Sequence, residues 1–198
     1  MKKIIIATKN KGKAKEFAAF FEAYDIQAVS LLDMVPEIHD IAETGATFIE
    51  NAVIKAEETA NFYQQAVLAD DSGLVIDALD GRPGVYSARY AGEQATDQAN
   101  IDKVMSELAE VPLEDRTARF VCVLAIAEPG KETFHQIGYC EGKIAFEQKG
   151  MNGFGYDPIF IPNGYELTMA ELSADEKNKI SHRNDALEKL QAYLSVLK

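Results

Sequence analysis

Two aspartates, a serine and a glycine follow one another at residues 70–73, directly after the apolar run Val67-Leu68-Ala69. Carboxylate oxygens are the ligands that hard divalent cations prefer, and Mg²⁺ typically takes one or two of them together with phosphate oxygens and water. Because neighbouring residues of a strand face opposite sides, one of Asp70 and Asp71 is expected to face a metal while the other does something else. The alternative is an Asx-type turn that ends the strand, with Gly73 allowing a sharp bend.

A second segment whose residue types suit a functional site is Thr8-Lys9-Asn10-Lys11-Gly12-Lys13, which lies between an apolar run and a helical pattern. Free N–H groups and the positive end of the helix dipole meet at such a place, and phosphate binds there readily. The segment is not a Walker A loop, because the first glycine of that motif is absent and Ala14 follows Lys13. A solvated basic turn is the alternative reading.

Single charged residues lie close to these segments in the sequence. Glu43 precedes the second predicted helix and is either a second metal ligand or an acidic residue of an exposed loop. Lys55, on that helix, either reaches a phosphate or is an ordinary exposed lysine. The sequence positions alone do not decide between these alternatives.

Further along, Gly153-Phe154-Gly155-Tyr156-Asp157-Pro158 alternates aromatic residues with glycines. The small flanking residues leave room for a planar ligand against a ring, and Asp157 can accept hydrogen bonds from a base edge; a tight aromatic turn is the alternative. Lys177 and the run Ser181-His182-Arg183 follow. His and Arg can donate to a carbonyl-bearing base; for Ser181 the alternative is a helix cap with charged residues around it.

The elements that must position these residues follow from periodicity. Strands are expected at 3–7, at 67–69 ending at the two aspartates, at 74–76, at 119–127, at 134–139 and 143–146 as a meander, and at 156–161. Helices are expected after Gly12, from a capping box at 47–50 to about Phe62, around 101–108, and at the end of the chain, where Leu187, Leu190, Leu194 and Leu197 form a stripe. Early alternation followed by clustered strands indicates a mixed α/β sheet.

Composition excludes several classes of protein. The 198 residues carry a net charge of −12, which disfavours binding to nucleic acid or to an anionic membrane. No apolar run has the length of a membrane span or of a signal peptide, so a cytoplasmic location is expected. Cys122 and Cys140 form no CxxC pair and are expected to be buried thiols. The chain shows no repeat or linker and is interpreted as one folded unit.

Taken together, these segments resemble the inosine triphosphate pyrophosphatase family, bacterial branch, along essentially the whole chain. The matching stretches are ATKNKGK (7–13), ETGATFIENAVIKA (43–56), ADDSGLVIDALDGRPGVYSARYAG (69–92), GFGYDPIF (153–160) and MAELSADEKNKISHR (169–183). Their shared order and spacing are far more specific than any one of them. Two positions depart from the pattern: Lys11 stands where many relatives carry Pro or another uncharged residue, and Ala42 replaces a common Glu.

The resemblance implies a Mg²⁺-dependent hydrolase that converts ITP, dITP and XTP to the monophosphate and pyrophosphate and so cleanses the nucleotide pool. It implies a single pyrophosphatase domain at 1–198 with an elongated mixed β-sheet, flanking helices and two lobes enclosing a nucleotide cleft, usually in a homodimer. Mapped onto matching positions, triphosphate binding falls to Thr8, Lys9, Asn10, Lys11, Gly12 and Lys13 with Lys55, metal binding to Glu43 and Asp71, and nucleotide contacts to Ser72, Phe154, Gly155, Tyr156, Asp157, Lys177, His182 and Arg183.

The family's usual proton acceptor corresponds to Asp71, but chemistry leaves this role open. A carboxylate bound directly to Mg²⁺ has a lowered pKa and is a weak base, so Asp70 or a metal-bound hydroxide are alternatives. A donor from Arg183 or a backbone N–H to the base O6 would reject adenine; how guanine is excluded does not follow from the sequence. The competing functions are a pyrophosphatase for pyrimidine or methylated nucleotides and a non-catalytic nucleotide sensor.

Overall fold

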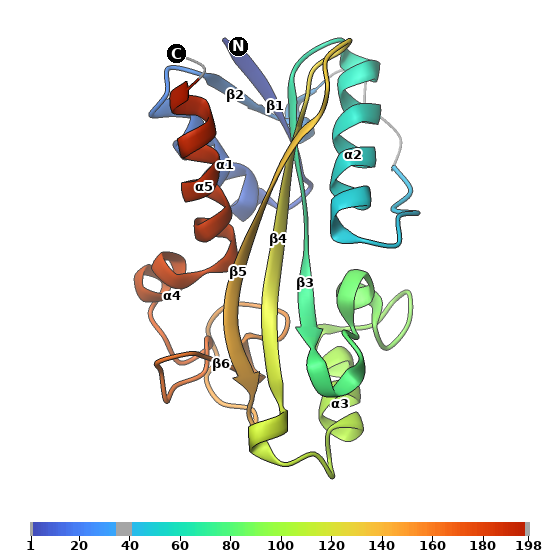
Figure 1. Ribbon diagram of the computed structural model, residues 1–198, viewed down its shortest axis with the longest axis vertical. Helices are drawn as coiled ribbons and strands as arrows, with labels where there is room; N and C mark the ends of the chain where they lie inside the picture. Colours follow the sequence, from blue (N-terminus) through green and yellow to red (C-terminus); the bar gives the residue numbers. More distant parts are fainter. Residues whose placement is uncertain (1, 35–40, 197–198) are drawn as a thin grey trace. The chain divides into compact units, whose positions relative to one another are not determined.

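The computed structural model describes residues 2–34 and 41–196 as an α/β protein with one mixed sheet (Figure 1). The six strands are β1 (Lys3–Ala7), β2 (Gln27–Ser30), β3 (Val67–Ile76), β4 (Thr117–Ala127), β5 (Phe134–Ile144) and β6 (Phe160–Pro162). Their order in the sheet is β2-β1-β3-β4-β5-β6. Strand β1 pairs in parallel with β2 and β3, whereas β5 and β6 are antiparallel, so the predicted mixed α/β sheet is confirmed.

The described helices are α1 (Lys11–Glu22), α2 (Phe48–Tyr63), α3 (Asp97–Glu107), α4 (Ala174–Ile180) and α5 (His182–Val196). Helix α2 begins at the predicted capping box, in which the Thr47 side chain accepts from the Glu50 N–H and Glu50 reaches back to the Thr47 N–H. None of the helices in the described part of the chain is long and apolar enough to cross a membrane. Leu197, predicted for the last helix, lies outside the described residues.

The chain divides into two compact units. The first takes the described residues of Met1–Asp71 together with Val123–Ile137, and the second takes those of Ser72–Cys122 and Gly138–Lys198. Strands β3, β4 and β5 therefore each contribute residues to both units. That residues 1–198 act as a single functional domain stays a prediction, as does the nucleotide cleft.

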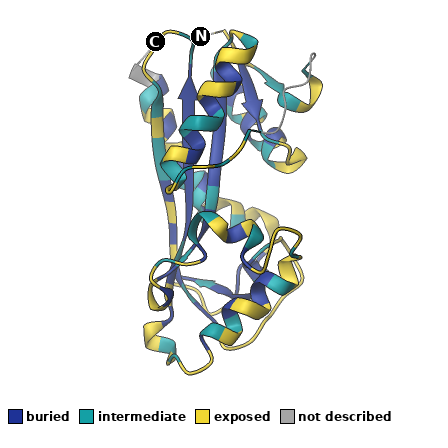
Figure 2. Cartoon of the chain, turned by 90° about the vertical axis from the view of Figure 1, so that its right-hand side faces the viewer, coloured by how far each residue is buried: buried dark blue, intermediate teal, exposed yellow. Residues whose placement is uncertain are grey.

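In the first unit, strand β1 is the centre of the core. Ile4, Ile5 and Ile6 are buried almost completely, and both α1 and α2 contact this strand. Helix α2 presents its small residues inward: the three alanines predicted for this face, Ala52, Ala56 and Ala60, are all buried. Figure 2 shows the same division along the helices, with buried faces in blue and exposed faces in yellow.

The second unit has its own apolar core, to which α3, the strand ends and the segment after β6 contribute. Its members share nearly complete burial and include Leu74, Ile76, Ile101, Val104, Leu108, Phe120, Ile144, Ile159, Phe160, Met169 and Leu172. The predicted stripe of α3 is present, because Ile101, Val104 and Leu108 all point into this core. This core supports the loop that carries Phe154.

The prediction that a strand ends at the two aspartates is wrong, and so is the alternative turn. Strand β3 runs without a break from Val67 to Ile76 and includes the Asp-Asp-Ser-Gly segment. Aspartate and glycine are poor strand formers on average, but tertiary contacts decide in a central strand. Here the Asp70 carboxylate pairs with Lys13 and its carbonyl accepts from Lys55, so the strand is stabilised where its sequence disfavours it.

Strand β5 is also longer than expected, since one strand at Phe134–Ile144 replaces the two predicted strands. Its glycines mark close contacts instead of turns. A Cβ on Gly138 would lie 2.2 Å from the His182 carbonyl oxygen, and one on Gly142 would lie 2.3 Å from the Ile161 carbonyl oxygen. The predicted strand at 156–161 is a 3₁₀ turn at Asp157–Ile159 followed by β6. Strand β2 and helix α4 were not predicted.

Candidate functional site

The lysine-rich segment 8–13 joins β1 to α1, as predicted, but α1 begins at Lys11, earlier than the predicted start after Gly12, and Asn10 caps the helix. The Asn10 side-chain oxygen accepts hydrogen bonds from the N–H groups of Gly12 (2.9 Å) and Lys13 (3.1 Å), and the Thr8 hydroxyl accepts from the Asn10 N–H (3.3 Å). Two of the N–H groups expected to meet a phosphate are therefore satisfied by Asn10. Lys9 and Lys11 are exposed.

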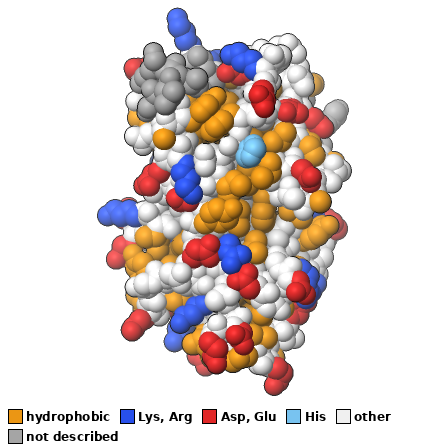
Figure 3. All heavy atoms as spheres, viewed as in Figure 1, with side chains coloured by type: hydrophobic (Ala, Val, Ile, Leu, Met, Phe, Trp, Pro, Cys, Tyr) orange, Lys and Arg blue, Asp and Glu red, His pale blue; other side chains and the backbone are white. Residues whose placement is uncertain are grey.

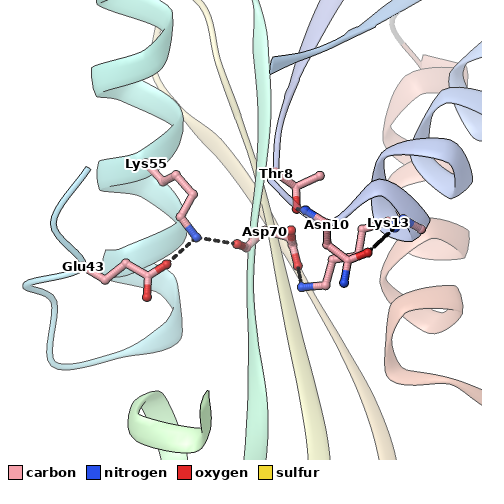
Figure 4. A network of polar contacts seen from close by, with 7 residues as sticks. Thr8, Asn10, Lys13, Glu43, Lys55 and Asp70 are labelled. Atoms are coloured by element: carbon pink, nitrogen blue, oxygen red, sulfur yellow. Dashed lines mark hydrogen bonds and ion pairs between the residues drawn. The ribbon is translucent and has the colours of Figure 1, made fainter. Parts of the chain in front are cut away.

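Two lysines of the first unit converge on Asp70 of β3 (Figure 4). The Lys13 ammonium lies 2.6 Å from the Asp70 carboxylate, which is only 3% exposed. The Lys55 ammonium donates to the Asp70 carbonyl oxygen at 3.0 Å and lies 2.5 Å from the Glu43 carboxylate. Segments far apart in the sequence, at residues 8–13, 43, 55 and 70, thus form one cluster, which is hereafter called the lysine–carboxylate cluster and includes Asp71.

The carboxyl of Asp71, a member of this cluster, has a raised pKa. Burial raises the pKa of its carboxyl to about 6 from 3.8, the nearby Lys55 opposes this rise, and the negative charges of Glu43 and Asp70 add to it. The pKa therefore reports above all a carboxyl with little water around it, and after that the opposing charges of Lys55 and of the two neighbouring carboxylates.

Asn51 is a member of this neighbourhood that sequence reasoning missed. Its side-chain oxygen accepts from the Gly45 N–H at 2.8 Å, it is 1% exposed, and its amide lowers the pKa of Asp71. A Cβ on Gly45 would lie 2.6 Å from that of Glu50, so the loop that carries Glu43 packs tightly against the start of α2. An asparagine inside an alanine-rich helix was the only signal, because asparagine is a weak helix former.

The second unit carries the predicted aromatic segment. The Asp157 carboxylate accepts from the Phe154 N–H at 2.9 Å and from the Lys177 ammonium. The Lys177 nitrogen also lies 4.8 Å from the centroid of the Phe154 ring, and that ring is 56% exposed. A cation beside an exposed ring and next to a carboxylate forms a surface that suits a flat ligand with polar edges.

Two residues that were not predicted hold this segment in place. The Gly155 N–H donates to the Asp97 carboxylate at 2.7 Å, and the Tyr156 hydroxyl donates to the Ser87 carbonyl oxygen at 2.8 Å. Tyr156 is buried, and burial raises the pKa of its hydroxyl. Tyr156 therefore anchors the loop from within, while Phe154 is left on the surface.

The predicted residues His182 and Arg183 begin α5. The alternative for Ser181 is confirmed, since its hydroxyl accepts from the Asn184 N–H at 3.1 Å and caps this helix. Arg183 is 9% exposed, and the His182 ring is stacked on Phe120 with centroids 5.0 Å apart and an interplanar angle of 21°. Ser72, the remaining predicted contact, is a half-buried residue of β3. Each unit thus carries one of the two predicted groups.

Comparison with known proteins connects both groups of residues to one family. The Ham1 family profile matches residues 4–193. The chain is 63% identical to the dITP/XTP pyrophosphatase of Oceanobacillus iheyensis over 197 residues, covering 100% of both chains. It is 57% identical to the dITP/XTP pyrophosphatase of Bacillus subtilis over 196 residues, covering 98% of both.

Solved structures of similar proteins point to the same family as the sequence relatives. The structure of the Staphylococcus aureus Ham1 protein superimposes with a TM-score of 0.93 at 45% identity, covering 100% of both chains. A HAM1 protein from Coxiella burnetii gives a TM-score of 0.92 at 44% identity, covering 98% of this chain and 99% of the other. The resemblance inferred from the sequence motifs is therefore confirmed, and this chain belongs to the Ham1 family.

Proposed function

We propose that this protein hydrolyses the non-standard purine nucleotides dITP, ITP and XTP to the nucleoside monophosphate and pyrophosphate. The observation that carries the proposal is the lysine–carboxylate cluster, which holds two ammonium groups beside an aspartate pair in a family with dITP/XTP pyrophosphatases. Cleavage between the α- and β-phosphates requires neutralisation of charge, an ordered water molecule and a stabilised leaving group. The cluster has groups for each requirement.

The lysines supply the positive charge for the triphosphate. Lys13 and Lys55 are held in fixed positions by Asp70 and Glu43, so little ordering is needed when phosphate oxygens arrive. Lys9 and Lys11 are exposed beside them at the start of α1 and add to the local positive charge. On the described part of the face shown in Figure 3, by contrast, Lys and Arg are scattered among Asp and Glu, as expected for a protein with a net charge of −12.

The residues present fit a Mg²⁺ ion. Carboxylates are the ligands this ion prefers, and Glu43 and Asp71 would hold it. The pKa of Asp71, raised by burial and by two neighbouring carboxylates, fits a position where a cation belongs. In the described part of the chain, no three His, Cys, Asp or Glu side chains form a complete metal cage; Mg²⁺ does not need one, because phosphate and water complete its shell. When bound, the ion would neutralise charge on the phosphate oxygens.

The two aspartates take different roles in this proposal. Asp70 positions the lysines, since its carboxylate pairs with Lys13 and its carbonyl oxygen accepts from Lys55. That ion pair occupies the Asp70 carboxylate, which therefore serves to position Lys13. Asp71 would then hold the metal and order the attacking water; because a carboxylate bound directly to Mg²⁺ is a weak base, its role as proton acceptor is a separate question that the kinetics of Asp71→Asn address. Lys55 contributes by stabilising charge in the transition state.

The aromatic segment of the second unit would bind the base. Phe154 offers an exposed face for stacking, the Asp157 carboxylate can accept from a base N–H, and Lys177 keeps that carboxylate in place. Donors at His182 and Arg183 would hydrogen-bond to the O6 carbonyl of hypoxanthine or xanthine. In adenine the same donors would meet an amino group, which is itself a donor. A site built to hydrogen-bond one group rejects an analogue without it by roughly 10⁴-fold.

Assembly and location belong to the same proposal. We extend it to a homodimer acting in the cytoplasm on the free nucleotide pool, with no nucleic acid or membrane partner. Sedimentation equilibrium of the purified chain tests the dimer, and a single species at the mass of one chain would contradict it.

The activity is tested by pyrophosphate release from dITP, ITP, XTP, dGTP, dATP and dUTP with Mg²⁺ or with EDTA. We expect release from the first three, with kcat/KM at least about 100-fold above that for dATP. Lys55→Met, which keeps the length of the side chain without its charge, should lose activity, whereas Lys131→Met, at an exposed i,i+3 pair, should not. Release from dUTP alone would favour a pyrimidine enzyme, and binding without turnover would favour a sensor.

A further inference from the structure

The imidazole of His182 belongs to a stack of three rings that come from three separate elements. The Phe120 ring of β4 lies 5.0 Å from the His182 ring at an interplanar angle of 21°. The Phe160 ring of β6 also packs against the Phe120 ring, with centroids 4.5 Å apart and an interplanar angle of 47°. All three residues belong to the second unit. A nearly parallel neighbour fixes the plane of a ring, whereas an aliphatic neighbour does not.

The supporting rings are themselves immobilised. Phe160 is fully buried, Phe120 is 8% exposed, and both belong to the apolar core of the second unit. The backbone of His182 is fixed as well, because Ser181 caps α5 and the His182 carbonyl lies against Gly138 of β5 so closely that a Cβ there would be 2.2 Å away. With its backbone and one face of its ring held, the imidazole retains little rotational freedom.

From this geometry we propose that Phe120 is a positioning residue for base recognition, which it serves by holding the plane of the His182 imidazole. The inference rests on the proposed function, in which His182 contacts the nucleotide. Phe120 touches no substrate in this account; it acts through His182 alone. A hydrogen bond from a ring N–H to a base carbonyl depends on the direction of that N–H, so the loss of a flat partner weakens the bond without removing the imidazole.

Phe120→Leu is the discriminating variant, because leucine keeps most of the buried hydrocarbon and removes the flat ring. We expect KM for dITP to rise about fivefold with kcat changed less than twofold, the size expected for one lost aromatic contact. In a His182→Asn background the same substitution should have no further effect on KM, since its target is gone. Val104→Ala, in the same core but away from the stack, controls for simple loss of stability and should leave KM unchanged.

A second readout needs no activity. The sequence contains three histidines, so a ¹H–¹³C correlation spectrum shows three imidazole Cε1–Hε1 signals, and His182→Asn identifies one of them. The proton signal of His182 should lie upfield through the ring current of Phe120 and should move downfield in Phe120→Leu. An unmoved signal, or an equal rise in KM in both backgrounds, overturns the positioning role. Failure of the proposed function is distinguishable, because it is the absence of pyrophosphate release by the wild-type protein.

Discussion

Asp71→Asn is expected to abolish activity and, at the same time, to stabilise the metal-free protein. The carboxyl pKa is 3.8 in an ordinary environment and about 6 in the folded protein, where burial and the charges of Glu43 and Asp70 outweigh the attraction of Lys55. A group whose folded pKa is raised binds more protons in the folded state between these two values, so folding stability falls as the pH rises through that window. The loss is complete above the folded pKa.

The magnitude follows from the shift. A rise of about two pKa units lowers the unfolding free energy by roughly 3 kcal/mol at pH 7.5. At pH 5 the loss is about half as large, because the folded carboxyl is mostly protonated there and the unfolded one is mostly ionised. Asparagine has nearly the same shape without the titration, so the variant should be the more stable protein in EDTA. The difference should grow by between about 1 and 2 kcal/mol from pH 5 to pH 7.5.

Urea denaturation followed by circular dichroism measures this, since the chain has no tryptophan to report by fluorescence. Asp102→Asn is the matched control, because Asp102 is exposed on α3 and accepts a hydrogen bond from the exposed Gln98; it should change stability by less than about 0.5 kcal/mol. Mg²⁺ should then raise the stability of the wild-type protein and not that of Asp71→Asn. A variant no more stable than wild type at pH 7.5 would refute the electrostatic account, and equal stabilisation of both by Mg²⁺ would refute Asp71 as a ligand.

Three further predictions follow from the contacts. In steady-state kinetics, Asp70→Asn should raise KM for dITP about tenfold, because Lys13 loses its ion-pair partner. Asp71→Asn should instead lower kcat by more than about 100-fold. Near-wild-type turnover of Asp71→Asn would exclude Asp71 as the proton acceptor. Gly153→Ala should raise KM at least about tenfold, because the φ of Gly153 is +79° and a Cβ there would lie 2.0 Å from the Asp157 carboxylate. Its control is Gly130→Ala, where φ is +76° but the space around the glycine is open, and this variant should leave KM unchanged. Arg116→Met should cost about 3 to 5 kcal/mol in urea denaturation, because this buried guanidinium donates to the carbonyls of Leu108, Val111 and Ala145, while Arg119→Met, whose ion pairs are on the surface, should cost less than about 1 kcal/mol.

The elements that sequence predicts well are those whose stability is local. Helix α2 has a capping box and a face of alanines, and α1 has a helical apolar period, so both were predicted close to their observed bounds. Strand β3 was not, because its continuity through Asp70 depends on lysines 57 and 15 residues away in the sequence. Strand β2 has a burial pattern with no fully buried residue, so it lacks the apolar run on which strand prediction relies.

The site shows the same division. Residues that contact a ligand through their own chemistry, such as lysines beside a helix start or an aromatic between glycines, can be found from sequence. Residues that position them cannot, since Asn51, Asp97 and Phe120 have ordinary neighbours in the sequence and acquire their roles through contacts with Gly45, Gly155 and His182. Unlike the local hydrogen bonds of a capping box, hydrogen bonds and stacking between separate elements carry no signature at the level of residue spacing.

The charge of the lysine–carboxylate cluster explains why an acidic protein can be expected to bind a polyanion. Glu43, Asp70 and Asp71 outnumber the paired lysines Lys13 and Lys55, so these five groups sum to −1 when all are ionised, and the exposed Lys9 and Lys11 bring the sum to +1. A sum this small balances little of the charge of a triphosphate, and a divalent cation would raise it to +3. The raised pKa of Asp71 has burial as its main cause, and the charges of Glu43 and Asp70 add to it against the opposing effect of Lys55. We therefore expect the nucleotide to bind as its metal complex, and we expect the charge of the cluster to matter more for this than the net charge of the whole chain.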